Sequence, residues 1–304
     1  APVAADAGPA AGAEPVAAED PGNVIAFTDP FRRHRARVRS LDILVADDHE
    51  ANRMVLQRLL QKAGHRVTCV HGAEEALDAM AAREFDVAIT DLHMPGMSGL
   101  DLLRQLRVMQ AGGGPRTPVV ILSADVTPEA IQRCNQAGAH AFMAKPVVAA
   151  RLLETMADIA SGAAAGTRDM AAVIPTFADG DAVLDTGVLD ELSALGMGKG
   201  FEREFVRQCL EDLESGIGAL PGDAQGEDWA RLREHAHAIT GVAANLGLLK
   251  VARQGGELMR MADWQLKGEW KPLHARIGAA LLEGRQALDA RAQGRAQSHD
   301  DVTG

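Results

Sequence analysis

Short runs of aliphatic and β-branched residues alternate with amphipathic stretches between Leu41 and about Ala160. The five apolar runs read LDILVA, RVTCV, DVAIT, PVVILS and HAFMA, and a stretch with helical spacing of its apolar residues follows each of them. A continuous apolar run is typical of a strand that is buried on both faces, and strands that alternate with helices pair in parallel. The alternation therefore predicts an α/β domain over residues 41–160, built on a doubly wound five-stranded parallel sheet.

Beyond this region the pattern changes. Residues 161–183 are rich in Ala, Gly and Asp and have the composition of an interdomain linker. Over residues 184–292 the apolar residues recur with a 3.6-residue period between short Gly breaks, which predicts an all-α antiparallel helical bundle. We expect residues 293–304 to form a frayed tail.

The N-terminal 40 residues lack the apolar content of a folded domain. About the first 29 are mostly Ala, Pro, Gly and Glu, and we expect them to be disordered because they bury too little apolar surface. The following segment, DPFRRHRARVRS, is basic. We interpret it as a solvated linker, with a nucleic-acid or anionic-lipid arm as the alternative.

The formal net charge of -11 argues against a general nucleic-acid partner, because phosphate backbones require a basic surface. The cysteines number 3 and lack metal-ligand spacing, which fits a reducing, cytoplasmic compartment better than a disulfide framework. No run of about 18 apolar residues exists, so we expect no direct membrane contact. The first residues also lack the charged and apolar regions of a signal peptide.

Ionisable and hydroxyl side chains stand where the predicted strands end. Asp47 and Asp48 follow the first strand, Asp91 the third, Ser123 the fourth and Lys145 the fifth. The carboxyl ends of parallel strands meet at one edge of the sheet, where open α/β sheets bind ligands. Carboxylates gathered there repel one another unless a hard cation joins them, and Mg2+ accepts such oxygen ligands together with phosphate. The pattern predicts Mg2+-dependent phosphoryl transfer onto an aspartate.

The ordered motifs LDILVADD, VAITDLHMPGMSG, PVVILS and AFMAKP resemble those of response-regulator receiver domains, over residues 41–160. The resemblance implies that Asp91 accepts the phosphoryl group and that Asp48 ligates Mg2+ most directly. It implies further roles as well: Asp47, Asp91 and the backbone carbonyl of His93 complete the Mg2+ ligands, Lys145 contacts the phosphoryl group, and Ser123 and Phe142 form the switch pair. Many relatives have Tyr at the position of Phe142, which puts any contact through that hydroxyl in doubt here.

The sequence EHAHAITGVAANLG resembles the motif of histidine phosphotransfer domains. The resemblance implies that His237 carries a phosphoryl group and that Gly241, one helical turn later, leaves room for an incoming receiver. Thr240 stands where the family commonly has Lys, and we hypothesise that Arg233 supplies the missing cation. The alternatives are a solvated helix histidine at His237 and a zinc pair with His235, although no third ligand is spaced nearby.

Both regions, together with the preceding segment AFTDPFRRHRARVRS, resemble the C-terminal part of hybrid sensor histidine kinases that respond to diffusible fatty-acid signals. This resemblance implies a kinase core in the same parent chain, a membrane-embedded parent with this segment in the cytoplasm, and a role in quorum sensing. Phosphate would pass to Asp91, then to His237 and on to a separate response regulator. The glycine boxes of an ATP-binding core are missing here, so we do not expect this segment to consume ATP by itself.

Two other functions fit parts of the pattern. The receiver surface around Phe142, Val147 and Val148 could dock a partner such as a crotonase-like signal synthase, with the charge of Asp91 tuning the affinity. A Mg2+-dependent hydrolase with an aspartyl-phosphate intermediate would share the acidic pair and the lysine, but the cap domain of such enzymes is missing. Taken singly, an aspartate at a strand end is more often a turn residue or a helix cap.

Overall fold

The computed structural model describes residues 29–112, 116–162 and 182–303. A parallel sheet of five strands forms the centre of the first domain, in the order β2-β1-β3-β4-β5. The strands are β1 (Asp42–Ala46), β2 (Arg66–Val70), β3 (Val87–Asp91), β4 (Val119–Ser123) and β5 (Ala141–Ala144). The predicted doubly wound sheet is confirmed. The chain order reverses between β1 and β3, which places the ligand-binding crevice of such folds at the carboxyl ends of these two strands.

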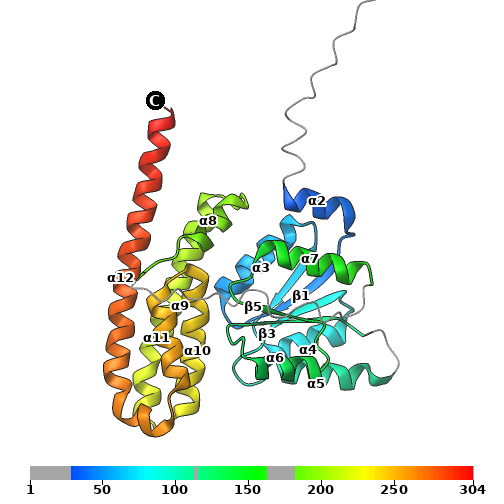
Figure 1. The fold of residues 1–304 in the computed structure, drawn as a ribbon. Coiled ribbons are helices and arrows are strands. Elements are labelled where there is room, and N and C mark those ends of the chain that lie inside the picture. The colour runs from blue at the N-terminus through cyan, green and yellow to red at the C-terminus, as the bar shows by residue number, and fades with distance from the viewer. Residues whose placement is uncertain (1–28, 113–115, 163–181, 304) are drawn as a thin grey trace, which may run out of the picture.

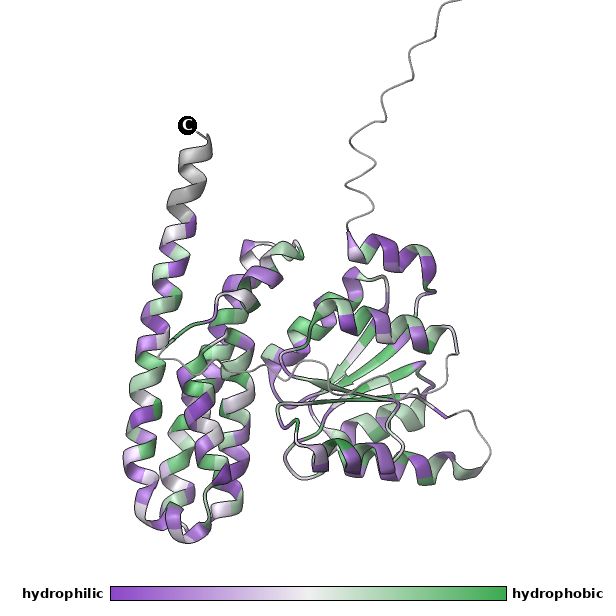
Figure 2. Cartoon of the chain, viewed as in Figure 1, coloured by the Kyte–Doolittle hydropathy of each residue, from purple (hydrophilic) through white to green (hydrophobic). Residues whose placement is uncertain are grey.

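Two helical layers cover the sheet (Figure 1). One layer is α3 (Glu50–Lys62) with α7 (Ala149–Ala160), and the other is α4 (Ala73–Ala82), α5 (Gly99–Met109) and α6 (Pro128–Gln136), with the short 3-10 turn Gln110–Gly112 after α5. Each layer encloses its own apolar core against the sheet. The strands are mostly hydrophobic along their length, whereas the helices carry hydrophobic and hydrophilic residues side by side (Figure 2), as a buried sheet between amphipathic helices requires.

The basic segment that precedes the sheet is a helix, which corrects our prediction of a solvated linker. Helix α2 (Pro30–Arg37) begins with the Asp29 side chain accepting hydrogen bonds from the backbone N–H groups of Phe31 and Arg32. Phe31 is 1% exposed and His34 6%. These two residues are three apart and share one helix face, so the arginines take the solvent side. Residues 1–28, expected to be disordered, lie outside the described part of the chain.

The second domain is the predicted helical bundle. A short helix, α8 (Gly187–Ala194), precedes four long ones: α9 (Lys199–Gln225), α10 (Trp229–Leu246), α11 (Leu249–Arg260) and α12 (Asp263–Thr303). Helix α12 continues to Thr303, so the tail that we expected to fray after Ala292 belongs to a helix; residues 291–297, RAQGRAQ, are mostly strong helix formers. Most of the predicted linker, residues 163–181, lies outside the described residues.

The two domains lie side by side (Figure 1), and apolar side chains pack between them. Ala51 and Val55 on α3 of the first domain pack into the core of the bundle. In return, Met197 from the loop between α8 and α9 is 6% exposed and packs into the core beneath α3 and α7. None of the described helices is both long enough and apolar enough to cross a lipid bilayer.

Candidate functional site

The side chains predicted at the strand ends meet at the carboxyl edge of the sheet. Asp47 follows β1, Asp91 is the last residue of β3, and Lys145 follows β5. The ammonium group of Lys145 donates hydrogen bonds to Asp47 Oδ2 at 2.8 Å and to Asp91 Oδ2 at 2.7 Å. All three residues are less than a tenth exposed. The sheet therefore brings two carboxylates together around one buried cation.

Burial governs the electrostatics of this trio. Burial alone would lower the pKa of Lys145, but the carboxylates of Asp47 and Asp91 outweigh it and raise that pKa. For the acidic Asp47 the sign is opposite: burial raises its pKa, and the charge of Lys145 opposes this effect. Lys145 is consequently an ammonium ion at neutral pH, held where charge would develop on a phosphoryl group bonded to Asp91.

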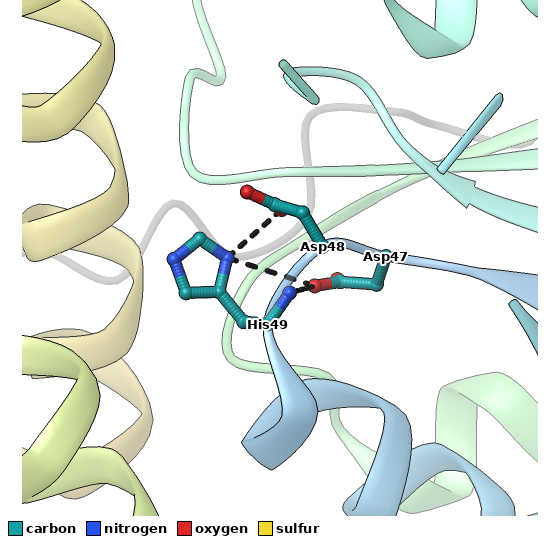
Figure 3. A group of neighbouring side chains, drawn as sticks. All are labelled: Asp47, Asp48 and His49. Atoms are coloured by element: carbon teal, nitrogen blue, oxygen red, sulfur yellow. Dashed lines mark hydrogen bonds and ion pairs between the residues drawn. The ribbon is translucent and has the colours of Figure 1, made fainter. Parts of the chain in front are cut away.

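Asp47, Asp48 and His49 form a group whose ligand atoms lie within 4.8 Å of one another (Figure 3). The carboxylate oxygens of Asp47 and Asp48 are the ligands that Mg2+ prefers, so these two residues fit the predicted ion. His49 Nδ1 lies 2.9 Å from Asp48 Oδ1. Burial raises the pKa of Asp48, yet this hydrogen bond and the charge of His49 outweigh it, and the pKa is lowered. Asp48 thus stays ionised.

Glycine is required beside the aspartate that ends β3. A Cβ atom on Gly99 would lie 2.0 Å from the carbonyl oxygen of Asp91. The backbone N–H of Gly99 donates to the carbonyl of Leu92 at 3.0 Å, which closes the loop that follows β3. The MPGMSG segment after Asp91 therefore folds back tightly onto the strand end.

The predicted switch residues are both buried. Ser123, 0% exposed, accepts a hydrogen bond from the backbone N–H of Asp125 at 3.0 Å. Phe142 is 6% exposed and packs into the core beneath α4, α5 and α6. Phe142 therefore has the inward orientation in this structure.

Helix α10 places His237 against the loop that follows β3 in the first domain. The rings of His237 and His93 lie with their centroids 4.0 Å apart. Burial, followed by the nearby His93 and Lys145, lowers the pKa of His237 to about 3. His237 is a neutral imidazole at physiological pH, which leaves one ring nitrogen with a free electron pair. Sequence reasoning gave His93 only a backbone role and did not find this ring contact.

A cleft of about 660 Å³ lies between the two domains, and both predicted phosphoacceptors, Asp91 and His237, line it. Asp48, Asp91, His93 and Lys145 line it from the sheet, and His237 lines it from α10. A Cβ atom on Gly241, one turn after His237, would lie 4.0 Å from the Cβ of Ala124 in the loop after β4. The space beside Gly241 therefore accommodates a methyl group at ordinary contact distance but not a longer side chain.

Neither Thr240, at the position of the family lysine, nor Arg233, its predicted substitute, forms a hydrogen bond with His237; both have other partners. The Thr240 hydroxyl donates to the carbonyl of Ala236 at 2.8 Å. The Arg233 guanidinium donates to the carbonyl of Met261 at 2.8 Å and forms an ion pair with Asp263. It therefore contributes to the junction of α11 and α12, and its hydrogen bonds and ion pair join it to Trp229, Met261 and Asp263 rather than to His237. The predicted role of Arg233 in phosphotransfer stays a prediction.

Two asparagines at the domain boundary were not identified from the sequence. Asn52 on α3 donates to Asp47 Oδ1 at 2.8 Å and to Asp47 Oδ2 at 3.0 Å. Its own oxygen accepts a hydrogen bond from Asn245 of α10 at 2.5 Å. The available signal was the position of Asn52 five residues after Asp47, in the first turn of a helix that starts at the sheet edge.

Family models match both domains. Residues 43–157 match the response regulator receiver domain, and residues 203–293 match the Hpt domain. A two-component response regulator of rice, ORR3, is 39% identical over 106 residues, which span 34% of this chain and 79% of that protein. The chain belongs to the two-component signalling proteins. Its receiver and Hpt domains together make it a part of a phosphorelay.

Among curated relatives, the sensory/regulatory protein RpfC of Xanthomonas campestris pv. campestris is 62% identical over 275 residues, 90% of this chain. The matched region is 37% of that protein, so this receiver–Hpt chain spans about a third of the length of RpfC. The predicted resemblance to the C-terminal segment of an RpfC-type hybrid sensor is confirmed. The receiver domain of sensor histidine kinase PA1611 from Pseudomonas aeruginosa PAO1, a solved structure with magnesium in its active-site cleft, is 27% identical with a TM-score of 0.37 and covers 41% of this chain and 99% of its own.

Proposed function

We propose that this segment carries out Mg2+-dependent phosphoryl transfer to Asp91, from Asp91 to His237, and from His237 to a separate response regulator. The observation that supports this most directly is the shared cleft, which is lined by Asp91, Lys145 and an unprotonated His237. A carboxylate acceptor, a cation and a neutral imidazole are the groups that a reversible aspartate-to-histidine transfer requires.

In the first step a carboxylate oxygen of Asp91 attacks phosphorus, a P–O bond forms, and the bond to the donor breaks. Lys145 stabilises the charge on the phosphoryl oxygens. In the second step the free electron pair of His237 attacks the same phosphorus, a P–N bond forms, and Asp91 returns as a carboxylate. Mg2+, when bound by Asp47, Asp48, Asp91 and the backbone carbonyl of His93, would neutralise charge on the phosphoryl oxygens.

The similarity to RpfC, a sensory/regulatory protein, supports a proposal for the setting. We propose a kinase core in the parent chain as the phosphate source, a membrane-bound parent with this segment in the cytoplasm, and a role in quorum sensing. Burial of His237 against His93 has a consequence for the last transfer. A downstream regulator reaches His237 only after the chain's own receiver has moved away from α10.

The test is phosphorylation of the purified chain with Mg2+ and acetyl phosphate, followed by mass-spectrometric mapping of base-labile phosphate on Asp91 and acid-labile phosphate on His237. We expect phosphate on Asp91 and His237 in the wild type, and on neither residue in Asp91→Asn. His237→Gln should retain phosphate on Asp91 only, and His235→Gln serves as the matched control that retains both. Phosphate on His237 in Asp91→Asn would contradict the relay, as would full labelling with EDTA in place of Mg2+.

The alternative, a docking surface for a signal synthase around Phe142, Val147 and Val148, gains no support from the described residues. Phe142 is buried. Val147 and Val148 line a cavity of about 70 Å³ together with Leu192 of the bundle, so part of this surface already faces the Hpt domain.

A further inference from the structure

Helix α10 contacts the receiver at three positions spaced four residues apart. The His237 ring lies against His93, Gly241 faces Ala124, and Asn245 bonds to Asn52. The first two contacts are close approaches without a hydrogen bond between the domains, so each tolerates some sliding of the helix. The amide pair is directional, and a slip by one helical turn, about 5.4 Å, would break it.

The acidic site fixes the orientation of this amide pair. The Asp47 side chain accepts hydrogen bonds from Asn52, from Lys145 and from the backbone N–H of His49, so donors surround its two oxygens. The NH2 group of Asn52 must therefore face Asp47, and its carbonyl oxygen must face the Hpt domain. The group that meets this oxygen has to be a donor, and the NH2 group of Asn245 is one.

The surroundings make this contact strong and selective. Asn52 is 7% exposed and Asp47 0%. An unpaired polar group at such a site loses its hydrogen bonds to water without replacement. A receiver with an apolar residue at this position would leave Asn245 without its partner, and one with a carboxylate would present an acceptor where the Asp47 oxygens now meet the Asn52 donor.

We infer that Asn245 is a positioning residue for the phosphotransfer proposed above: it acts through Asn52 to set the register in which His237 faces Asp91. The α10 face accordingly accepts receivers whose first helix presents a side-chain amide beside the acidic pair. The chain's own receiver meets this requirement, and in this structure it occupies the face.

The test measures, in the full-length chain, the rate at which phosphate passes from Asp91 to His237 after a pulse of acetyl phosphate. We expect Asn245→Ala to slow this transfer about tenfold, the effect of losing one buried hydrogen bond. The rate at which Asp91 is first labelled should not change, because Asn245 does not contact that residue. Gln265→Ala, which removes a side-chain amide at the start of α12, is the control and should transfer at the wild-type rate.

A double-mutant cycle separates positioning from a general loss of structure. Asn52→Ala also removes two hydrogen bonds to Asp47, so its own effect includes the acidic site. In that background Asn245→Ala should cause no additional slowing, since its partner is already gone. Additive effects, or transfer within twofold of the wild type in Asn245→Ala, would overturn the inference. If His237 is never labelled in the wild type, the proposed relay itself is wrong, and this result is distinguishable from a failure of the role of Asn245 alone.

Discussion

His93 and His237 lie in different domains, and their rings are in contact with centroids 4.0 Å apart. His93 extends from the loop after β3, two residues beyond Asp91, and it covers His237 on α10. Burial is the largest cause of the low pKa of His237, and His93 is the second. The receiver therefore contributes to the protonation state of the histidine that it faces.

Replacing His93 with Ala should raise the pKa of His237. The substitution removes both a covering ring and a neighbouring titratable group, so the value should rise from about 3 towards the ordinary 6.5. NMR titration of the His237 ring C–H signals measures the change. His140→Ala is the control, because His140 precedes the amino end of β5. An unchanged titration curve in His93→Ala would show that the contact with His93 does not bury His237 in solution.

Acid should destabilise the chain through buried histidines. Burial lowers the pKa of His65 to about 4 and is the largest cause of the value of about 3 at His237. Because these values lie below the ordinary 6.5, the unfolded chain takes up protons first. Their stabilising contribution is complete above pH 6.5 and is lost as pH falls towards 4, with a slope of up to about 1.4 kcal/mol per pH unit for each group.

Urea unfolding at pH 7.5, 6 and 5 tests this dependence. Carboxylates also contribute to acid unfolding, so the informative quantity is the difference between the wild type and His237→Gln. That variant should lose less stability over the interval than the wild type does. Equal losses would show that His237 does not take up a proton on unfolding.

The cluster of Asp47, Asp91 and Lys145 was predictable because it depends on local patterns and one topological rule. Each apolar run ends at the residue in question, and parallel strands bring such ends together. Helix α2 was not predicted because the density of arginines concealed the stripe of Phe31 and His34.

The docking of α10 was beyond sequence reasoning for a different reason. It depends on surfaces nearly two hundred residues apart, such as those of Asn52 and Asn245, and no periodicity relates them. His93 illustrates the limit, since its neighbour Asp91 explained its position and nothing in the sequence pointed to His237. Arg233 illustrates the converse, because its proximity along α10 predicted a role at His237 whereas Met261 and Asp263 bind its guanidinium.

A small and a large side chain at Gly241 should differ in their effect on phosphate transfer to His237. Gly241→Ala places a Cβ at ordinary contact distance, 4.0 Å from Ala124, and removes a glycine from a helix interior. The free energy of unfolding should rise by about 0.5–1 kcal/mol with little change in transfer. Gly241→Leu should hold α10 away from the receiver and slow labelling of His237 at least about 100-fold, on the scale of a misplacement of about 1 Å. Equal transfer in the two variants would contradict the close approach.

Lys145→Ala should destabilise the receiver by about 3–5 kcal/mol, as expected when one partner of a buried ion pair is removed. Asp47 and Asp91 would then face each other with no cation between them. Urea unfolding at pH 7.5 measures the loss, and labelling by acetyl phosphate should fall below detection. Lys250→Ala breaks an ion pair at the surface of the bundle and is the control, with a change of at most about 1 kcal/mol.

Met197→Asp should separate the domains without unfolding either one. Met197 comes from the loop between α8 and α9 but packs into the receiver core, so a charge there opposes docking rather than bundle formation. Asp91 should be labelled by acetyl phosphate at the wild-type rate, whereas labelling of His237 should slow markedly and its ring should become reactive towards diethyl pyrocarbonate. The matched control is Leu282→Asp on α12, where the side chain is 60% exposed and the charge meets solvent. Protection of His237 in Met197→Asp would mean that α10 is held on the receiver by its own face alone, through His93, Ala124 and Asn52.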